Sequence, residues 1–145
     1  MISQTAEYAL RAVVCLAHAG SPAKTTHEIA AITHVPAGYL SKVLLALTRA
    51  GVLQSQRGLH GGFSLTKPTD QMSVLDVINA VDPIKRITTC PLSLASHGTN
   101  LCTLHRRLDD AIAMIERTFA NARLSDLLPR HGDITPLCEQ PGGAA

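Results

Sequence analysis

The order of segments in the first half constrains this fold more than any other feature: two short helical stretches are followed by a hairpin with a glycine-rich tip. The tip is segment 58–62, with the sequence GLHGG, and it separates two strand-like runs over 52–57 and 63–67. Glycines between two such runs favour a tight hairpin turn. The sequence therefore predicts a mainly helical domain that carries one small β-hairpin.

The helical stretches have clear start and stop signals. The first is expected from about Ser3, a capping residue, to about residue 18, before the breaking segment 20–22 (GSP). The second begins at Thr25, where the residues TTHE have the form of a capping box, and it stops near residue 34. The third is expected to place Pro36 at its first helical position and to run to residue 50, with Gly51 as its stop.

The third helix has a buried side and an outer side. Apolar residues at helical spacing form the buried stripe: Leu40, Val43, Leu44 and Leu47. The outer side carries Tyr39, Ser41, Lys42, Ala46 and Arg49. Two short helices joined by a tight turn and followed by a basic hairpin have the order of a winged helix-turn-helix.

In a winged helix-turn-helix, a helix reads base edges in the major groove, and the hairpin reaches phosphates or the minor groove. The predicted DNA-binding residues are Thr26, Tyr39, Ser41, Lys42, Arg57, His60, Gly61 and Gly62. The alternative for the outer helix face and the hairpin is a solvated surface without a partner. The charge distribution is compatible with DNA binding by the first half: residues 1–67 contain six basic and two acidic residues, and residues 68–145 contain seven basic and nine acidic ones.

The second half is expected to hold a short helix over 73–82, a loop, and a long helix from about Asn100 to Ala122. The long helix has an apolar stripe at helical spacing: Leu101, Leu104, Leu108, Ala111, Ile112, Ile115 and Phe119. So small a protein cannot bury this stripe alone, so a second copy is expected to cover it. The expected units are a winged helix-turn-helix DNA-binding domain at 1–82, a sensor loop at 83–99, a dimerisation helix region at 100–128 and a flexible tail at 129–145.

Composition excludes several classes of protein. Aromatic residues make up 3% of the chain and Trp is absent, so the core must be aliphatic, which favours helices over a β-sandwich. No apolar run approaches the roughly 20 residues of a membrane helix. The N-terminus lacks the basic segment of a secretion signal, so the protein is expected in the cytoplasm, where its four cysteines stay reduced. No catalytic or phosphate-binding arrangement is apparent, so enzymatic activity is not expected.

Five short motifs occur in register along the chain: YALRA at 8–12, IA at 29–30, YL at 39–40, LTRAGV at 47–52 and RGxxGGFxL at 57–65. Together they resemble the IscR/NsrR/CymR family of winged-helix transcription regulators, the Rrf-two family, over about residues 1–128. The resemblance implies a homodimer joined by the long helix, with two winged helices on a pseudo-palindromic operator in double-stranded DNA. For many members it also implies an iron–sulfur cluster held by three loop cysteines, which reports nitric oxide, redox state or cluster supply.

The sequence departs from this family where the cluster is held. The family pattern has three cysteines, each separated by five residues; here Cys90 and Cys102 keep the outer spacing, but the middle position is Ser96. Cys102 is expected in the first turn of the long helix, where the helix dipole favours the iron-binding thiolate. Cys90 and Cys102 are therefore the predicted metal ligands, and the alternative is two inert buried thiols. Cys15 is expected in the core, and Cys138 is expected to be a free thiol in the tail.

The remaining ligands must come from other residue types. His105 lies three residues after Cys102 and matches the histidine ligand of IscR-like members; His97 is a further candidate. Glu7 matches the position from which some members offer a carboxylate across the dimer, although Glu7 and Arg11 also have the spacing of an ordinary surface pair. Such mixed ligands favour a 2Fe–2S cluster over a 4Fe–4S cluster.

The predicted function is a transcriptional regulator, expected to be a repressor, whose operator affinity is controlled by this cluster. One alternative is a clusterless regulator of the same fold that responds to thiol oxidation or to a small metabolite. Another is a zinc- or iron-stabilised interaction module that does not bind DNA. Brown protein with iron and sulfide after anaerobic purification would distinguish the first reading from the other two.

Overall fold

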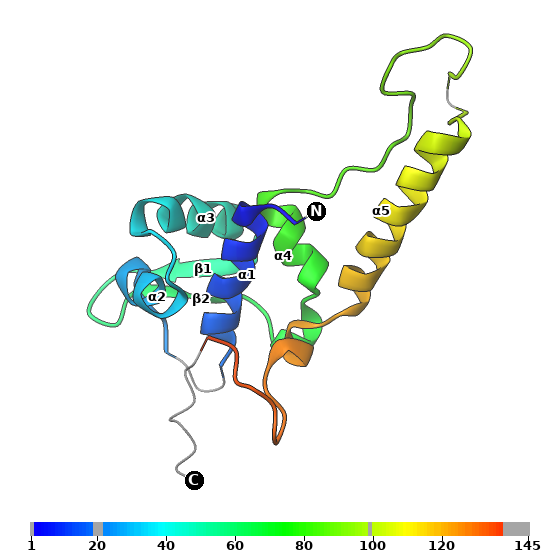
Figure 1. The fold of residues 1–145 in the computed structure, drawn as a ribbon. Helices are drawn as coiled ribbons and strands as arrows, with labels where there is room; N and C mark the ends of the chain where they lie inside the picture. Colours follow the sequence, from blue (N-terminus) through cyan, green and yellow to red (C-terminus); the bar gives the residue numbers. More distant parts are fainter. Residues whose placement is uncertain (1, 19–21, 99, 138–145) are drawn as a thin grey trace.

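The computed structural model describes residues 2–18, 22–98 and 100–137, and within these ranges the chain is mainly helical with one two-stranded hairpin, as predicted. Figure 1 shows two regions: a body of helices around the hairpin, and an arm that extends away from it. We define the body as the segments up to residue 82 and the arm as residues 83–121. Helix α1 (Gln4–Ala17) begins at the predicted cap, because Ala6 N donates to Ser3 Oγ at 3.1 Å.

Helices α2 (Thr26–Thr33) and α3 (Ala37–Arg49) form the predicted helix-turn-helix. Glu28 N donates to Thr25 Oγ1 at 3.2 Å and Thr25 N donates to Glu28 Oε2 at 2.7 Å, so the capping box is confirmed. The hydrogen bond from Thr25 N, and then a second from Thr25 Oγ1 to the same carboxylate oxygen at 3.0 Å, lower the pKa of Glu28. The turn uses His34 in the left-handed region, with φ of 57°. Pro36 was expected at the first helical position and is instead the N-cap, because its ψ of 129° is extended.

The hairpin consists of β1 (Leu53–Gln56) and β2 (Gly62–Leu65), paired antiparallel from Leu53 opposite Leu65 to Gln56 opposite Gly62. Both strands are shorter than predicted and the second starts one residue earlier. A further bridge joins Phe63 to Lys24, with Phe63 N donating to Lys24 O at 2.7 Å and Lys24 N donating to Phe63 O at 3.1 Å. The hairpin is therefore attached to the segment that leads into α2.

The core of the body follows the predicted aliphatic stripe. Leu40, Leu44 and Leu47 of α3 are fully buried and belong to one cluster with Ile29 of α2 and Val13 of α1. Cys15 lies in the same cluster, as expected. The burial of these side chains is the main term that holds α1, α2 and α3 together, at about 1.5–3 kcal/mol for each large aliphatic residue.

Helix α4 (Val74–Val81) begins at a second capping box, formed by Ser73 and Asp76. The short 3-10 helices η1 (Thr69–Gln71) and η2 (Leu124–Leu127) were not predicted. The chain returns to the body after the arm, since Val74 N donates to Ala122 O and Leu124 N donates to Met72 O, both at 2.9 Å. This return anchors the C-terminal end of the arm to the start of α4.

The arm contains the loop after α4 and helix α5 (Thr103–Asn121), which Figure 1 shows reaching beyond the body. The helix starts three residues later than predicted because Leu101 and Cys102 precede it as extended or irregular chain, and Cys102 is its N-cap. The structure describes every residue of α5 and none is buried. Leu104 and Leu108 are 63% and 48% exposed, so the first half of the apolar stripe is largely uncovered within this protomer, whereas Phe119 near its end packs against the core.

Two further sequence predictions concern the ends of the molecule and membranes. Within the described part of the expected tail, Leu137 packs against the core; Cys138 lies outside the described residues. Among the described helices, none is by itself long and apolar enough to cross a membrane, and α2 and α3 meet that test only as a pair bent by 113°.

Candidate nucleic-acid interface and candidate metal site

The outer face of α3 carries exposed cationic and small residues. Lys42, Leu45, Ala46 and Arg49 line one shallow hollow on this face. Within the part of the chain that the structure describes, neither Lys42 nor Arg49 forms an ion pair. Ser41 is exposed, and its Oγ donates to Ala37 O at 3.0 Å. The face can therefore offer two uncompensated positive charges to an anionic partner.

Tyr39, one of the predicted DNA-binding residues, has contacts inside the body that the sequence did not reveal. Its ring lies edge-on to the ring of Tyr8, with 5.5 Å between centroids and 80° between planes, and its hydroxyl forms a hydrogen bond with Thr5 Oγ1. Arg11 lies over Tyr8, with 5.4 Å from its guanidinium carbon to the ring centroid. Tyr39 thus joins the start of α3 to α1, and it remains 39% exposed.

The hairpin tip holds two more of the predicted DNA contacts. Arg57 and His60 are exposed, and Leu59 between them is 95% exposed. A Cβ at Gly61 would lie 2.6 Å from Gln56 O. Gly62 has φ of 144°, and a Cβ there would lie 2.4 Å from the Lys24 carbonyl. Both glycines are therefore needed for the shape of the hairpin, whatever they contact outside it.

Thr26, the remaining predicted contact, is the first residue of α2 and is half-buried. The cap of that helix is its neighbour Thr25. The helix-turn-helix and hairpin elements belong to one body, and the bridge between Lys24 and Phe63 connects them directly. Cationic residues on α3 and at the hairpin tip can thus be presented together.

The candidate metal ligands are only partly brought together. Cys102 Sγ lies 3.3 Å from His105 Nδ1, which is the contact expected for residues three apart at the start of a helix. The prediction that Cys102 lies within the first turn was wrong by one residue, since it caps the helix, and its thiol does not accept a cap hydrogen bond. The Cys102–His105 pair is accessible, because both residues are half-buried.

Cys90 and His97 lie in the loop before α5. Cys90 is buried, and its carbonyl accepts a hydrogen bond from Ser93 N at 3.0 Å. Ser96, which occupies the middle position of the cysteine pattern, is exposed. His97 Nδ1 is enclosed and has no hydrogen-bond partner within the described residues. An enclosed imidazole nitrogen without a partner is costly unless something binds it.

Glu7 lies on α1, where Arg11 Nε donates to its Oε1 at 2.8 Å. Figure 1 shows α1 in the body and the start of α5 at the far end of the arm. Among the described residues no three His, Cys, Asp or Glu side chains form a metal-binding group. Two thiols and two imidazoles suit iron chemically, but one protomer assembles only two of them.

The base of the loop is fixed to α5 by a two-pronged ion pair. Arg86 Nε and Nη2 donate to Asp109 Oδ1 and Oδ2 at 2.8 and 2.7 Å, and Ile87 N donates to Oδ1 at 2.9 Å. The hydrogen bonds from Arg86, and then the one from Ile87, lower the pKa of Asp109 to about 2. No sequence signal indicated this contact, which joins residues 23 positions apart.

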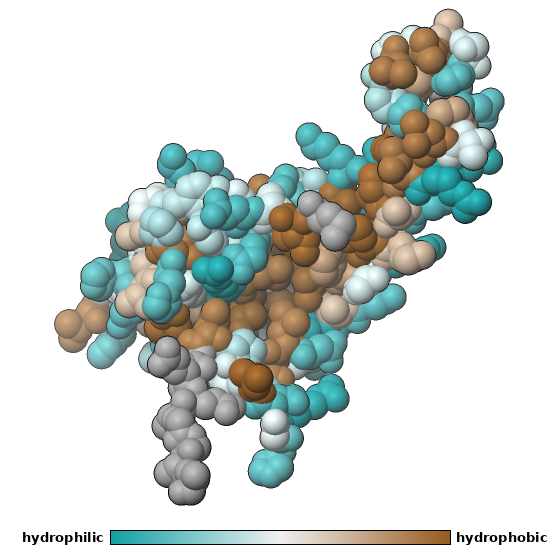
Figure 2. Space-filling model, viewed as in Figure 1, coloured by the Kyte–Doolittle hydropathy of each residue, from teal (hydrophilic) through white to brown (hydrophobic). Residues whose placement is uncertain are grey.

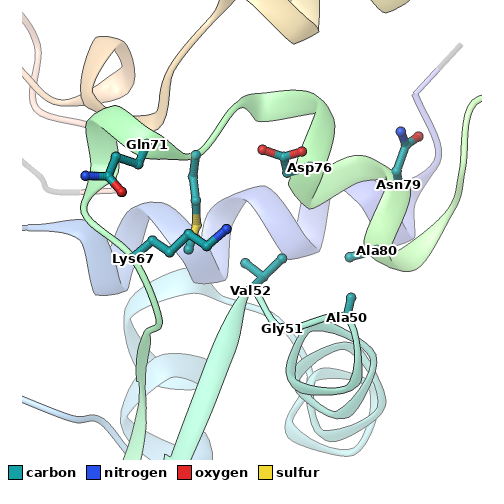
Figure 3. A pocket seen from close by; sticks show the side chains of 9 residues that line it. Ala50, Gly51, Val52, Lys67, Gln71, Asp76, Asn79 and Ala80 are labelled. Atoms are coloured by element: carbon teal, nitrogen blue, oxygen red, sulfur yellow. The ribbon is translucent and has the colours of Figure 1, made fainter.

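Two further hollows lie beside α4. One of about 590 Å³ lies between the start of α1, the segment after α4 and α5, and its lining is largely apolar: Ile78, Ile84, Ile87, Leu108, Ile112 and Phe119. In Figure 2 brown surface continues from the body along α5. The other, of about 330 Å³, lies between the end of α3 and α4 and is drawn in Figure 3; it presents Lys67, Gln71, Asp76 and Asn79 beside Val52. None of the predicted site residues lines this second hollow.

Comparison with known proteins gives consistent matches. A family model named Rrf2, an iron-dependent transcriptional regulator, matches residues 2–130. A helix-turn-helix transcriptional regulator from Aquifex aeolicus (strain VF5) is 29% identical over 131 residues, which cover 88% of this chain and 91% of that protein.

Solved structures agree in fold. CymR of B. subtilis, the global cysteine regulator, has a TM-score of 0.69 and 25% identity, with 88% of this chain and 95% of that chain covered. IscR of T. potens has a TM-score of 0.71 and 22% identity, with 88% and 85% covered. These similarities confirm the predicted architecture, a winged helix-turn-helix domain followed by a long C-terminal helix.

Proposed function

This chain belongs to the Rrf2 family of transcriptional regulators, and from that premise we propose that it is a homodimeric repressor that binds a pseudo-palindromic operator and is controlled at the start of α5. The family's winged-helix members bind DNA and are typically dimeric, and they are not enzymes. The observation that carries the proposal is one body that presents uncompensated cations on α3 and at the hairpin tip.

DNA recognition follows from that arrangement. A B-form major groove admits one α-helix, so the outer face of α3 has room to approach base edges there. Lys42 and Arg49 supply phosphate contacts, which position a protein on the duplex without reading its sequence. Arg57 and His60 at the hairpin tip reach the adjacent backbone or minor groove. Tyr39 contributes its exposed edge while its hydroxyl holds α3 against α1.

Dimerisation is supported by the uncovered side of α5. Leu104 and Leu108 remain largely exposed in one protomer, and the apolar hollow of about 590 Å³ beside α5 is open. Packing α5 against its symmetry mate buries this stripe. Two copies of α3 then face the operator on one side, with half-sites separated by roughly one helical turn, about 34 Å.

The control site proposed here is a 2Fe–2S cluster held by Cys90, Cys102 and His105. His97, with its unpartnered Nδ1, or Glu7 of the second copy would complete the ligand set. When bound, a cluster supplies a group that reacts with oxidants or nitric oxide. Cys102 caps α5, so whatever holds the Cys102 thiol also fixes the first turn of the dimerisation helix.

A second candidate is a regulator without a cluster. Two observations favour it: no three metal-binding side chains meet within the described residues, and a polar hollow lies against the end of α3. Under this reading the signal is oxidation of Cys90 or Cys102, or a small metabolite held in the hollow of Figure 3. The similarity to CymR, a cysteine regulator, points in the same direction.

The DNA-binding proposal is tested with Lys42→Ala and Arg57→Ala. The ligand is double-stranded DNA that the wild-type protein selects from a random pool, and affinity is measured by fluorescence anisotropy over a series of salt concentrations. Each variant should bind more weakly, and the salt dependence should fall by about one unit of slope if the residue contacts phosphate. Arg130→Ala, an exposed position near the C-terminus, is the matched control. Unchanged affinity in both test variants contradicts these assignments.

The cluster proposal is tested by anaerobic purification and reconstitution, followed by iron and sulfide analysis. Cys90→Ala and Cys102→Ala should lose the cluster, and His105→Ala should alter its visible spectrum. Cys15→Ala, which changes a thiol in the core, is the control and should keep it. Colourless wild-type protein without iron favours the second candidate, and a cluster that survives both loop substitutions places the site elsewhere.

A further inference from the structure

One ion pair differs from the others in the part of the chain that the structure describes. Arg11–Glu7 and Arg130–Asp126 each join residues four apart. Arg86–Asp109 joins two separate segments, the chain after α4 and helix α5. It is also the pair with the best geometry, because both carboxylate oxygens of Asp109 receive a guanidinium N–H. Paired parallel hydrogen bonds of this kind give orientation as well as attraction.

Asp109 is also more enclosed than an ordinary surface carboxylate. Its side chain is 15% exposed, and the backbone N–H of Ile87 donates to Oδ1 at 2.9 Å. The backbone at residue 87 is therefore held by the same carboxylate as the side chain at residue 86. This double attachment fixes the chain direction at the point where the loop leaves the body.

The position of this pair in the sequence relates it to the candidate metal ligands. Apart from Glu7 on α1, every residue considered as a metal ligand lies between its two members: Cys90, His97, Cys102 and His105. Asp109 is seven residues after Cys102, or about 10 Å further along the helix axis. The ion pair therefore closes residues 86–109 into a loop that contains these four candidate ligands.

The same contact borders the expected dimer surface. Ile84 and Ile87, on either side of the Arg86 attachment, line the apolar hollow together with Ile112 of α5. A displacement of residue 87 would change both the loop that holds Cys90 and the wall of this hollow. The sensor loop and the dimer surface thus meet at one attachment point.

We propose that the Arg86–Asp109 clamp is the positioning device of the sensor loop: it fixes the start of the segment that carries Cys90 to α5 and carries changes in the loop to the dimer surface. The regulatory use of the clamp rests on the function proposed above, but the clamp itself does not depend on the kind of signal. Arg86 and Asp109 are positioning residues, since they act through Cys90 and Ile87.

The test measures cysteine alkylation in reduced, metal-free, full-length protein, with each cysteine followed by peptide mass spectrometry. Cys90 and Cys15 are both buried, one in the arm and one in the core of the body. In Arg86→Ala and Asp109→Asn, the rate at Cys90 should rise about fivefold, the scale expected for loss of a partly exposed ion pair. Cys15 should keep its wild-type rate, and Arg86→Lys should restore part of the protection.

Arg130→Ala, which removes the exposed pair with Asp126, is the control and should leave Cys90 unchanged. An unchanged rate at Cys90 in Arg86→Ala and Asp109→Asn overturns the clamp. Equal acceleration at Cys90 and Cys15 also overturns it, because the ion pair would then contribute only to global stability.

A second measurement separates the clamp from the cluster. Wild-type protein and the same variants are reconstituted with iron and sulfide, and iron content and visible circular dichroism are recorded. If wild-type protein retains no iron while the variants expose Cys90, the clamp stands and the cluster proposal fails. If wild-type protein retains iron and the variants match it in spectrum and in Cys90 protection, the clamp fails and the cluster proposal stands.

Discussion

The body and the arm differ in how their helices begin and in how far their side chains are buried. In the body, α1, α2 and α4 each begin at a Ser or Thr whose side chain accepts a hydrogen bond from the helix backbone, and a single aliphatic cluster joins the elements. In the arm, α5 begins at Cys102 without a side-chain cap, and no residue of the helix is buried. The body contains its own determinants of structure, whereas Leu104 and Leu108 of the arm remain exposed within one protomer.

The largest expected contrast comes from placing a carboxylate in each region. Leu44→Asp, at a fully buried position of the body, should unfold the domain, because an unpaired buried charge costs several kcal/mol. Leu108→Asp in the arm should leave the body folded and prevent dimerisation. Thermal unfolding by circular dichroism and sedimentation velocity measure the two effects.

Arg117→Asp is the matched control for Leu108→Asp, because residue 117 lies on the opposite face of α5, which has 3.6 residues per turn. It should remain dimeric. If the wild-type protein sediments as a stable monomer, α5 needs no second copy to cover its apolar side chains. The proposed difference between the body and the arm would then be wrong.

Glycine substitutions sharpen the comparison at a smaller scale. Gly62→Ala in the body would force a Cβ to within 2.4 Å of the Lys24 backbone and should cost about 2 kcal/mol or more. Gly98→Ala in the arm meets open space at φ of 45°, so it should cost about 1 kcal/mol or less. Urea unfolding measures both, and equal costs would contradict the difference in packing.

Ser96→Cys tests the arm's dependence on an external group. It restores the three-cysteine pattern at an exposed position, so it should retain at least as much iron per protomer as wild-type protein and lose it more slowly to a chelator. Ser96→Ala, which adds no donor, should show no gain. Faster iron loss in Ser96→Cys than in Ser96→Ala would show that residue 96 does not face the metal.

The smallest expected effect is a titration in strong acid. Arg86 and Ile87 lower the pKa of Asp109 from 3.8 to about 2, so the clamp stabilises the folded arm above about pH 4 and this contribution is lost as pH falls through about 2. The NMR shift of the Ile87 amide should follow that midpoint and stay constant between pH 5 and 8. In Arg86→Ala the midpoint should move up toward 3.8; a change centred near neutral pH would contradict the assignment.

The sequence was a good guide where structure depends on neighbouring residues. The caps at Ser3 and Thr25 and the buried stripe of α3 were all identified, because capping and helical periodicity act within one or two turns. The contact between Cys102 and His105 was also accessible to this reasoning, since it spans three residues.

The features that escaped prediction join distant segments. Tyr39 with Thr5, Gly62 with Lys24 and Arg86 with Asp109 are brought together only by the tertiary fold, and no local periodicity marks them. Cys90 shows the opposite case: the spacing paired it with Cys102, but among the described residues of one protomer no metal-binding group forms. Cys90 can belong to a complete metal site only if the loop closes toward α5 or if a second chain supplies further ligands.

The bridge between Lys24 and Phe63 has a consequence for the operator. It attaches the hairpin to the segment that leads into α2, so the helix-turn-helix and the hairpin should move as one rigid unit when the arm changes position. In the proposed dimer, a signal that arrives through α5 would change the separation of the two DNA-binding domains but not the contacts that each makes within its own half-site. Base substitutions inside a half-site should lower the DNA affinity by the same factor in both signalling states. Adding or removing a base pair between the half-sites should change the DNA affinity of the two states by different factors.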